Sequence, residues 1–172
     1  IIRCFLFHGH ITDFLLLSTL VPIIKDKLGD HCSSKNYRSI AISSLIMKIV
    51  DWVIVLLYSD ILNLDELQFG FQPKCSTTMC TWLAMETVDY YLRNGSSIYS
   101  CLMDMTKAFD LVKHSTLFHK LLSKGLPVIF VRLLVVQYQN QKANVRWNGK
   151  FSHSFSLSNG VKQGAVLSPL LY

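Results

Sequence analysis

Paired cysteines are missing from this sequence. None of its five cysteines forms a C-x-x-C pair, and the two neighbouring histidines, His114 and His119, have no cysteine pair near them. The ligand spacing of a structural zinc site is therefore absent, and so is the framework of a small disulfide-bonded domain. We expect neither zinc nor disulfides, which fits a reducing intracellular setting. No internal repeat or cleavable signal peptide is visible either.

Acidic side chains are absent after Asp110. Eight lysines and arginines follow it without a single carboxylate between them, and the whole chain carries a formal charge of +6. A segment that is basic throughout attracts polyanions, and nucleic acid is the usual partner. The alternative is a solvated basic face that binds nothing.

Long uninterrupted apolar runs are also scarce, although 51% of the residues are hydrophobic and only 16% are charged. The longest candidate, residues 40–58, contains Lys48 and Asp51 near its centre. Each charge there would cost about 2.5–3.5 kcal/mol on membrane insertion. We therefore expect a buried helix with this polar pair facing outward, and no membrane span. The chain begins with Ile1 and ends soon after the helix-start pattern Ser168-Pro169, so we expect a fragment of a longer protein.

Hydrophobic spacing and turn residues predict a mixture of helices and strands. The expected helices cover residues 1–18, 45–58, 77–93, 115–124 and 127–138, and the expected strands cover 19–24, 37–42, 98–103, 142–147 and 151–157. Pro22 favours an edge position for its strand, because proline cannot donate a ladder hydrogen bond. Asn148-Gly149 is a strong signal for a hairpin turn. Residues 82, 85, 88 and 92 form an apolar stripe that we expect in the core.

One acid stands at an unusual place, since the apolar strand expected at residues 98–103 ends on Asp104. A buried carboxylate costs several kcal/mol unless a cation pairs with it. Mg²⁺ takes carboxylate and phosphate oxygens, so Asp104 suits a site of phosphoryl transfer. The alternative is that Asp104 only caps the turn after the strand.

Two longer motifs favour the metal-binding alternative. Residues 104–110 (DMTKAFD) and 160–171 (GVKQGAVLSPLL) resemble, in the right order, the first two catalytic motifs of reverse transcriptases from non-LTR (LINE-type) retrotransposons. Residues 21–25 (VPIIK), 36–40 (NYRSI) and 68–71 (QFGF) are similar to further motifs of that family. The resemblance covers roughly residues 20–172.

The resemblance implies a right-hand polymerase of α+β class, with an antiparallel sheet backed by helices. Residues 1–96 would belong to the fingers and residues 97–172 to part of the palm. The partners would be an RNA template, a DNA primer and a dNTP, in the nucleus of the host cell. The cofactor would be Mg²⁺, or Mn²⁺ in its place.

The family's site residues map onto six positions here. Asp104, with the backbone carbonyl of Met105, would hold the metal. Arg38 and Lys25 would bind the triphosphate, since a planar guanidinium grips phosphate with two parallel hydrogen bonds; the alternative is that Arg38 pairs with Asp26 or Asp30. Phe109 would lie beneath the ribose and exclude a 2′-hydroxyl, or else is an ordinary core residue. Gln163 would contact the incoming nucleotide.

The sequence departs from the family at several points. Ser39 replaces a usual proline, Lys162 stands where arginine is common, and residues 72–74 differ from the usual continuation of their motif. The two adjacent aspartates of the third catalytic motif are absent. We therefore expect these 172 residues alone to be inactive, and the alternative function is a catalytically dead nucleic-acid-binding remnant.

Overall fold

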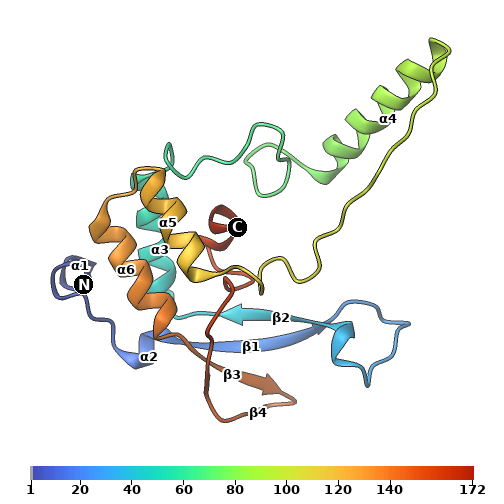
Figure 1. The fold of residues 1–172 in the computed structure, drawn as a ribbon. Coiled ribbons are helices and arrows are strands. Elements are labelled where there is room, and N and C mark those ends of the chain that lie inside the picture. The colour runs from blue at the N-terminus through green and yellow to red at the C-terminus, as the bar shows by residue number, and fades with distance from the viewer. Residues whose placement is uncertain (1) are drawn as a thin grey trace. The chain divides into compact units, whose positions relative to one another are not determined.

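The computed structural model describes residues 2–172 (Figure 1). Contacts divide the chain into two compact units, one made of residues 1–62 and 107–172 and the other of residues 63–106. The larger unit contains α1 (Ile2–His8), α2 (Asp13–Leu16), β1 (Leu17–Ile24), a 3₁₀ turn (Ser34–Asn36), β2 (Tyr37–Ile42), α3 (Leu45–Leu57), α5 (His114–Ser123), α6 (Val128–Gln139), β3 (Lys142–Trp147), β4 (Lys150–Phe151), β5 (Phe155–Ser156) and α7 (Ser168–Leu171). The smaller unit contains α4 (Thr77–Arg93).

The sheet of the larger unit runs in the order β2-β1-β3-β4, and β5 also pairs with β3. All neighbours are antiparallel except β1 and β3, which run parallel. The predicted α+β class is therefore confirmed, with one parallel pair in an otherwise antiparallel sheet. A parallel pair needs a long crossover, and here the chain between β1 and β3 supplies helices.

Strand β1 has neighbours on both sides, but Pro22 itself lies in an edge position, as predicted. It stands opposite Ser39 in the pairing of β1 with β2. Strand β3 pairs with β1 only from Leu17 to Leu20. Among the described strands, Pro22 therefore has one neighbour only, and its missing N–H leaves no ladder bond unmade.

Three helices form the main hydrophobic core, and Figure 1 shows α3, α5 and α6 lying together beside the sheet. Helix α3 begins where predicted, because the Ser44 hydroxyl accepts a hydrogen bond from the amide of Met47 at 3.3 Å. Its buried apolar residues are Met47, Val50 and Ile54, at steps of three and four. They pack with buried leucines of α5 and α6.

The smaller unit holds two corrections to the predictions. Helix α4 forms as expected, with Ser76 as its cap, but none of its described residues is buried. The predicted strand at residues 98–103 is absent, and Tyr99, Leu102 and Met103 are more than nine-tenths exposed. Residues 63–106 contain no strand that could pair with this segment and no second helix that could cover the stripe on α4. An extended segment without a partner has unmade backbone hydrogen bonds and is not stable alone.

None of the helices described for residues 2–172 combines the length and the apolar composition that crossing a bilayer requires.

Candidate functional site

The β1–β2 hairpin positions two of the predicted site residues. Arg38 stands on β2 opposite Ile23, and its side chain is exposed. Neither Asp26 nor Asp30 pairs with it. Each acid instead accepts a backbone N–H from its own loop, Leu28 to Asp26 at 2.9 Å and Cys32 to Asp30 at 2.8 Å. The ion pairs described within residues 2–172 do not include Arg38. Its exposed guanidinium can therefore donate hydrogen bonds to a phosphate.

Lys25 lies at the end of the same hairpin and is engaged with it. Its ammonium donates to the carbonyl oxygen of Lys35 at 2.9 Å, and its backbone N–H donates to the carbonyl oxygen of Asn36 at 2.8 Å. The side chain is exposed. Lys25 therefore closes the base of the loop between the strands, and it adds positive charge to the end of β1.

The segment Gly160–Gly164, which carries Gln163, is tied by its backbone to two other motifs. The amide of Gly160 donates to Val112 at 2.9 Å, and the amide of Val161 donates to Phe109 at 2.8 Å. On the other side, the amide of Ala41 in β2 donates to the carbonyl oxygen of Gln163 at 2.8 Å. The structure therefore places the Gln163 segment between the turn that contains Phe109 and the strand that contains Arg38.

The distance along β2 sets the scale of this arrangement. Arg38 precedes Ala41 by three residues, which corresponds to about 10 Å along a strand. Gln163 is partly buried, while Arg38 is exposed. Joint contact of Arg38 and Gln163 with one nucleotide stays a prediction.

Both glycines of this segment adopt a backbone that other residues avoid, with φ of 83° at Gly160 and 99° at Gly164. A Cβ atom at Gly160 would lie 2.9 Å from the carbonyl oxygen of Asp110. The close approach of the segment to the turn at residues 109–112 therefore requires glycine at this position.

Phe109 is partly buried and packs against the hydrophobic core. Its ring stacks on Tyr172, with ring centres 5.4 Å apart and an angle of 27° between the planes. Its backbone carbonyl oxygen receives the amide of Val161. Its place beneath a ribose stays a prediction, and its packing shows how the ring is held at the edge of the core.

Asp51 is buried, and the prediction that it faces outward with Lys48 is wrong. It is 4% exposed on α3, and Gln137 of α6 donates to its Oδ1 atom at 3.3 Å. Burial raises the pKa of Asp51 to about 6, although the hydrogen bond from Gln137 and the charge of Lys162 act in the opposite direction. Helical spacing could have revealed this burial, because Asp51 lies four residues after Met47 and three before Ile54, on the apolar face of α3. The prediction gave more weight to the charge of Asp51 than to its position.

Lys162, between Val161 and Gln163, is also buried, at 8% exposure. Burial lowers the pKa of its ammonium, and the charge of Asp51 partly opposes this shift. The motif gave a signal for a charged residue here, because arginine is common at the position of Lys162 in the family that this segment resembles.

Asp104 and Met105 belong to the smaller unit, at the end of an irregular exposed segment. Met105 is 69% exposed. Residues 2–172 contain no group of three or more histidine, cysteine or acidic side chains that could hold a metal ion. One carboxylate and one backbone carbonyl are too few for the two-metal site of phosphoryl transfer. The described residues therefore show no complete metal site, and the metal role of Asp104 and Met105 stays a prediction.

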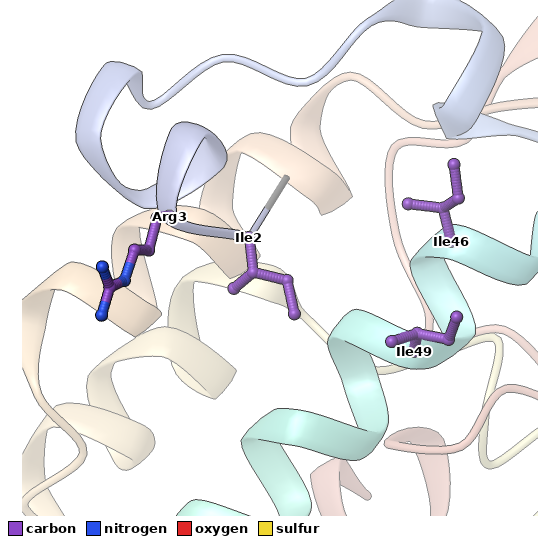
Figure 2. A pocket seen from close by; sticks show the side chains of 4 residues that line it. All are labelled: Ile2, Arg3, Ile46 and Ile49. Atoms are coloured by element: carbon purple, nitrogen blue, oxygen red, sulfur yellow. The ribbon is translucent and has the colours of Figure 1, made fainter.

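An apolar hollow lies elsewhere on the larger unit. Figure 2 shows Ile2 and Arg3 of α1 and Ile46 and Ile49 of α3, which line an apolar hollow of about 390 Å³. None of the predicted site residues lines it. Its walls offer one guanidinium and no acceptor side chain, so it does not suit a nucleotide.

Comparison with known proteins identifies the chain. The family described as "Reverse transcriptase (RNA-dependent DNA polymerase)" matches residues 24–172. The chain belongs to the reverse transcriptase family. The prediction made from its motifs is thereby confirmed.

Curated relatives of this reverse transcriptase chain come from mobile elements. The Pol polyprotein of the type-2 retrotransposable element R2DM of Drosophila melanogaster is 30% identical over 142 residues, which is 80% of this chain and 13% of that protein. A probable RNA-directed DNA polymerase from the Drosophila melanogaster transposon BS is 28% identical, over 81% of the chain and 16% of the relative. The Pol polyprotein of the type-1 element R2 of Popillia japonica is 25% identical, over 99% of this chain and 24% of that protein. The reverse transcriptase chain thus spans no more than a quarter of the length of these relatives.

Proposed function

We propose that this chain is the nucleotide-binding region of an RNA-directed DNA polymerase from a LINE-type retrotransposon. Residues 1–96 would act as the fingers and residues 97–172 as part of the palm. One observation carries the proposal. Backbone hydrogen bonds join the Gly160–Gly164 segment both to Phe109 and to the strand of Arg38.

The reaction explains why these groups belong together. In DNA synthesis a primer 3′-hydroxyl attacks the α-phosphate of a dNTP, and pyrophosphate leaves. The protein must therefore bind the triphosphate and select the sugar. In this proposal Arg38 grips the phosphates with its guanidinium, and Lys25 adds positive charge nearby. Gln163 contacts the nucleotide, and Phe109 excludes a 2′-hydroxyl.

Asp104 is proposed as one ligand of Mg²⁺, or of Mn²⁺ in its place, with the carbonyl of Met105 as a second. Such an ion supplies positive charge beside the reacting phosphate. The sequence has no pair of adjacent aspartates. We therefore propose that these 172 residues alone do not synthesise DNA.

The partners proposed for the parent protein are an RNA template and a DNA primer in the nucleus. The basic stretch after Asp110 supports this, because it can neutralise backbone phosphates.

The test is binding of dNTP by the purified chain in the presence of Mg²⁺, measured by titration calorimetry. Arg38→Ala is expected to weaken binding by about 10- to 100-fold, the range of a lost charge-assisted hydrogen-bond pair. Arg3→Ala is the matched control, because this exposed arginine lies on α1, away from the β1–β2 hairpin. Equal binding by the Arg38 and Arg3 variants would remove the triphosphate role of Arg38.

The same measurements examine the alternative of a catalytically dead remnant. A remnant would bind nucleic acid with a steep dependence on salt and would not bind dNTP at all.

A further inference from the structure

We infer that Asp51 is a positioning residue of the nucleotide site. Its buried carboxylate attracts the buried ammonium of Lys162 and thereby holds the Gly160–Gly164 segment against β2 and the turn at residues 109–112. The inference rests on the proposed function in one respect only, that the adjacent Gln163 contacts the nucleotide.

The first argument is the burial of two opposite charges in one region. Asp51 is 4% exposed and Lys162 is 8% exposed. An isolated buried ion costs several kcal/mol, so a buried acid and a buried base are retained together only when each reduces the cost of the other. Each charge does act on the other here, since Lys162 lowers the pKa of Asp51 and Asp51 raises that of Lys162.

The second argument is that no other group within residues 2–172 is seen to neutralise Asp51. Gln137 donates a single hydrogen bond to it at 3.3 Å and carries no charge. Tyr138 lies near enough for its own pKa to be raised by the charge of Asp51, so it is no counter-ion. The described ion pairs at contact distance do not include Asp51 or Lys162. Val50 and Val161, the chain neighbours of Asp51 and Lys162, belong to one buried hydrophobic cluster, so the two charges attract each other in a region from which water is largely excluded.

The third argument is the place of Lys162 within its segment. The residues on both sides of it are bonded through the backbone, Val161 to Phe109 and Gln163 to Ala41. Gly160 and Gly164 bracket the segment, and glycine leaves the chain free to adopt other conformations. A buried Lys162 ammonium held by the charge of Asp51 restricts that conformational freedom.

The fourth argument concerns the element that carries Asp51. Helix α3 follows β2 after two residues, so the chain that presents Arg38 continues directly into the helix that presents Asp51. The pair thus links the strand of the proposed triphosphate ligand to the segment of the proposed nucleotide contact. A change at Asp51 should alter both the order of the segment and the affinity for dNTP.

The experiment measures amide hydrogen exchange at Gly160, Val161 and Ala41 in three variants. Asp51→Asn keeps the shape and removes the charge, Lys162→Met keeps the bulk and removes the charge, and the third combines both. Exchange at these amides is expected to accelerate about tenfold in each single variant and much less in the double variant, because coupled charges give non-additive effects. Asp60→Asn, which alters an exposed acid of the same unit, is the matched control.

The result that would overturn the inference is unchanged exchange in Asp51→Asn, or simple addition of the two single effects. Should Asp51→Asn fail to fold, Lys162→Arg against Lys162→Met decides, since arginine keeps the charge and should keep the protection. Affinity for dNTP in the presence of Mg²⁺ is the second measurement, and about a tenfold loss in Asp51→Asn with recovery in the double variant is expected. Absence of dNTP binding by the unaltered chain would contradict the proposed function and leave the exchange result as the test of the pairing.

Discussion

Asp51 shows how a single buried charge can lower stability and still be retained. Its pKa of about 6 lies above the usual aspartate value of 3.8, so the folded chain binds the proton more tightly than the unfolded chain does. The ionised carboxylate therefore reduces the stability of the fold at neutral pH. Such a cost is consistent with a charge kept to hold Lys162 in place.

The prediction for this residue concerns the free energy of unfolding as a function of pH. Between the two pKa values the folded state carries a proton that the unfolded state has lost, so the contribution of Asp51 to stability is fully present below about pH 4 and is lost as the pH rises through 6. A shift of this size corresponds to about 3 kcal/mol. Urea denaturation from pH 4 to pH 7 should show this slope in the unaltered chain, relative to Asp51→Asn.

The groups that face Asp51 set the conditions of that comparison. Lys162 and Gln137 both favour its ionised form, and Tyr138 is affected by its charge without losing its own proton in this range. Parallel pH profiles in the two proteins would show that Asp51 titrates in the folded chain as it does in water.

Among the elements, the Gly160–Gly164 segment gives the sharpest expectation. Gly160→Ala and Gly125→Ala both place a side chain at positive φ, 83° and 90°, so both carry the same kind of backbone strain. They differ in their surroundings, because a Cβ at Gly125 meets nothing within 4 Å while one at Gly160 lies 2.9 Å from the carbonyl oxygen of Asp110.

Thermal and urea unfolding of the two variants should therefore separate. We expect Gly160→Ala to destabilise the fold by about 1–3 kcal/mol more than Gly125→Ala does, the usual cost of overpacking. It should also weaken dNTP binding, which Gly125→Ala should leave unchanged. Equal losses of stability would mean that the turn at residues 109–112 yields to the added atom.

The elements that sequence alone predicted are those fixed by local chemistry. Asn148 and Gly149 both have positive φ, as their hairpin turn requires, and Ser44 caps α3. The strand expected at residues 98–103 failed because a strand depends on distant partners, which its own residues do not encode.

The candidate site shows the same difference between local features and features that depend on distant partners. The resemblance to the family implies roles for Arg38, Gln163 and Phe109, which stay predictions, and these residues lie in one compact unit whose segments are joined by backbone hydrogen bonds. Helical spacing places Asp51 on the apolar face of α3, but its partners could not be identified, because Gln137 and Lys162 lie far along the chain. The metal role of Asp104 stays a prediction.

At the scale of the whole molecule, the chain belongs to the reverse transcriptase family. DNA synthesis by two metal ions, however, needs more than one carboxylate. The described residues supply no group of three acids or histidines, and the sequence has no adjacent aspartates. A two-metal reaction needs several carboxylates to hold both ions. Nucleic-acid binding has no such requirement, because it needs only the cations that follow Asp110.

The two activities should therefore separate in one experiment. On a primed RNA template with Mg²⁺ and dNTPs, these 172 residues are expected to bind the template-primer with an affinity that falls steeply as salt is raised, and to extend no primer. Gel-shift titrations at several salt concentrations and a primer-extension assay measure the two outcomes on the same sample, with an active reverse transcriptase as the positive control. Mg²⁺-dependent extension that Asp104→Asn abolishes would contradict the proposed inactivity, because a single aspartate in this chain would then be enough to anchor the catalytic metal.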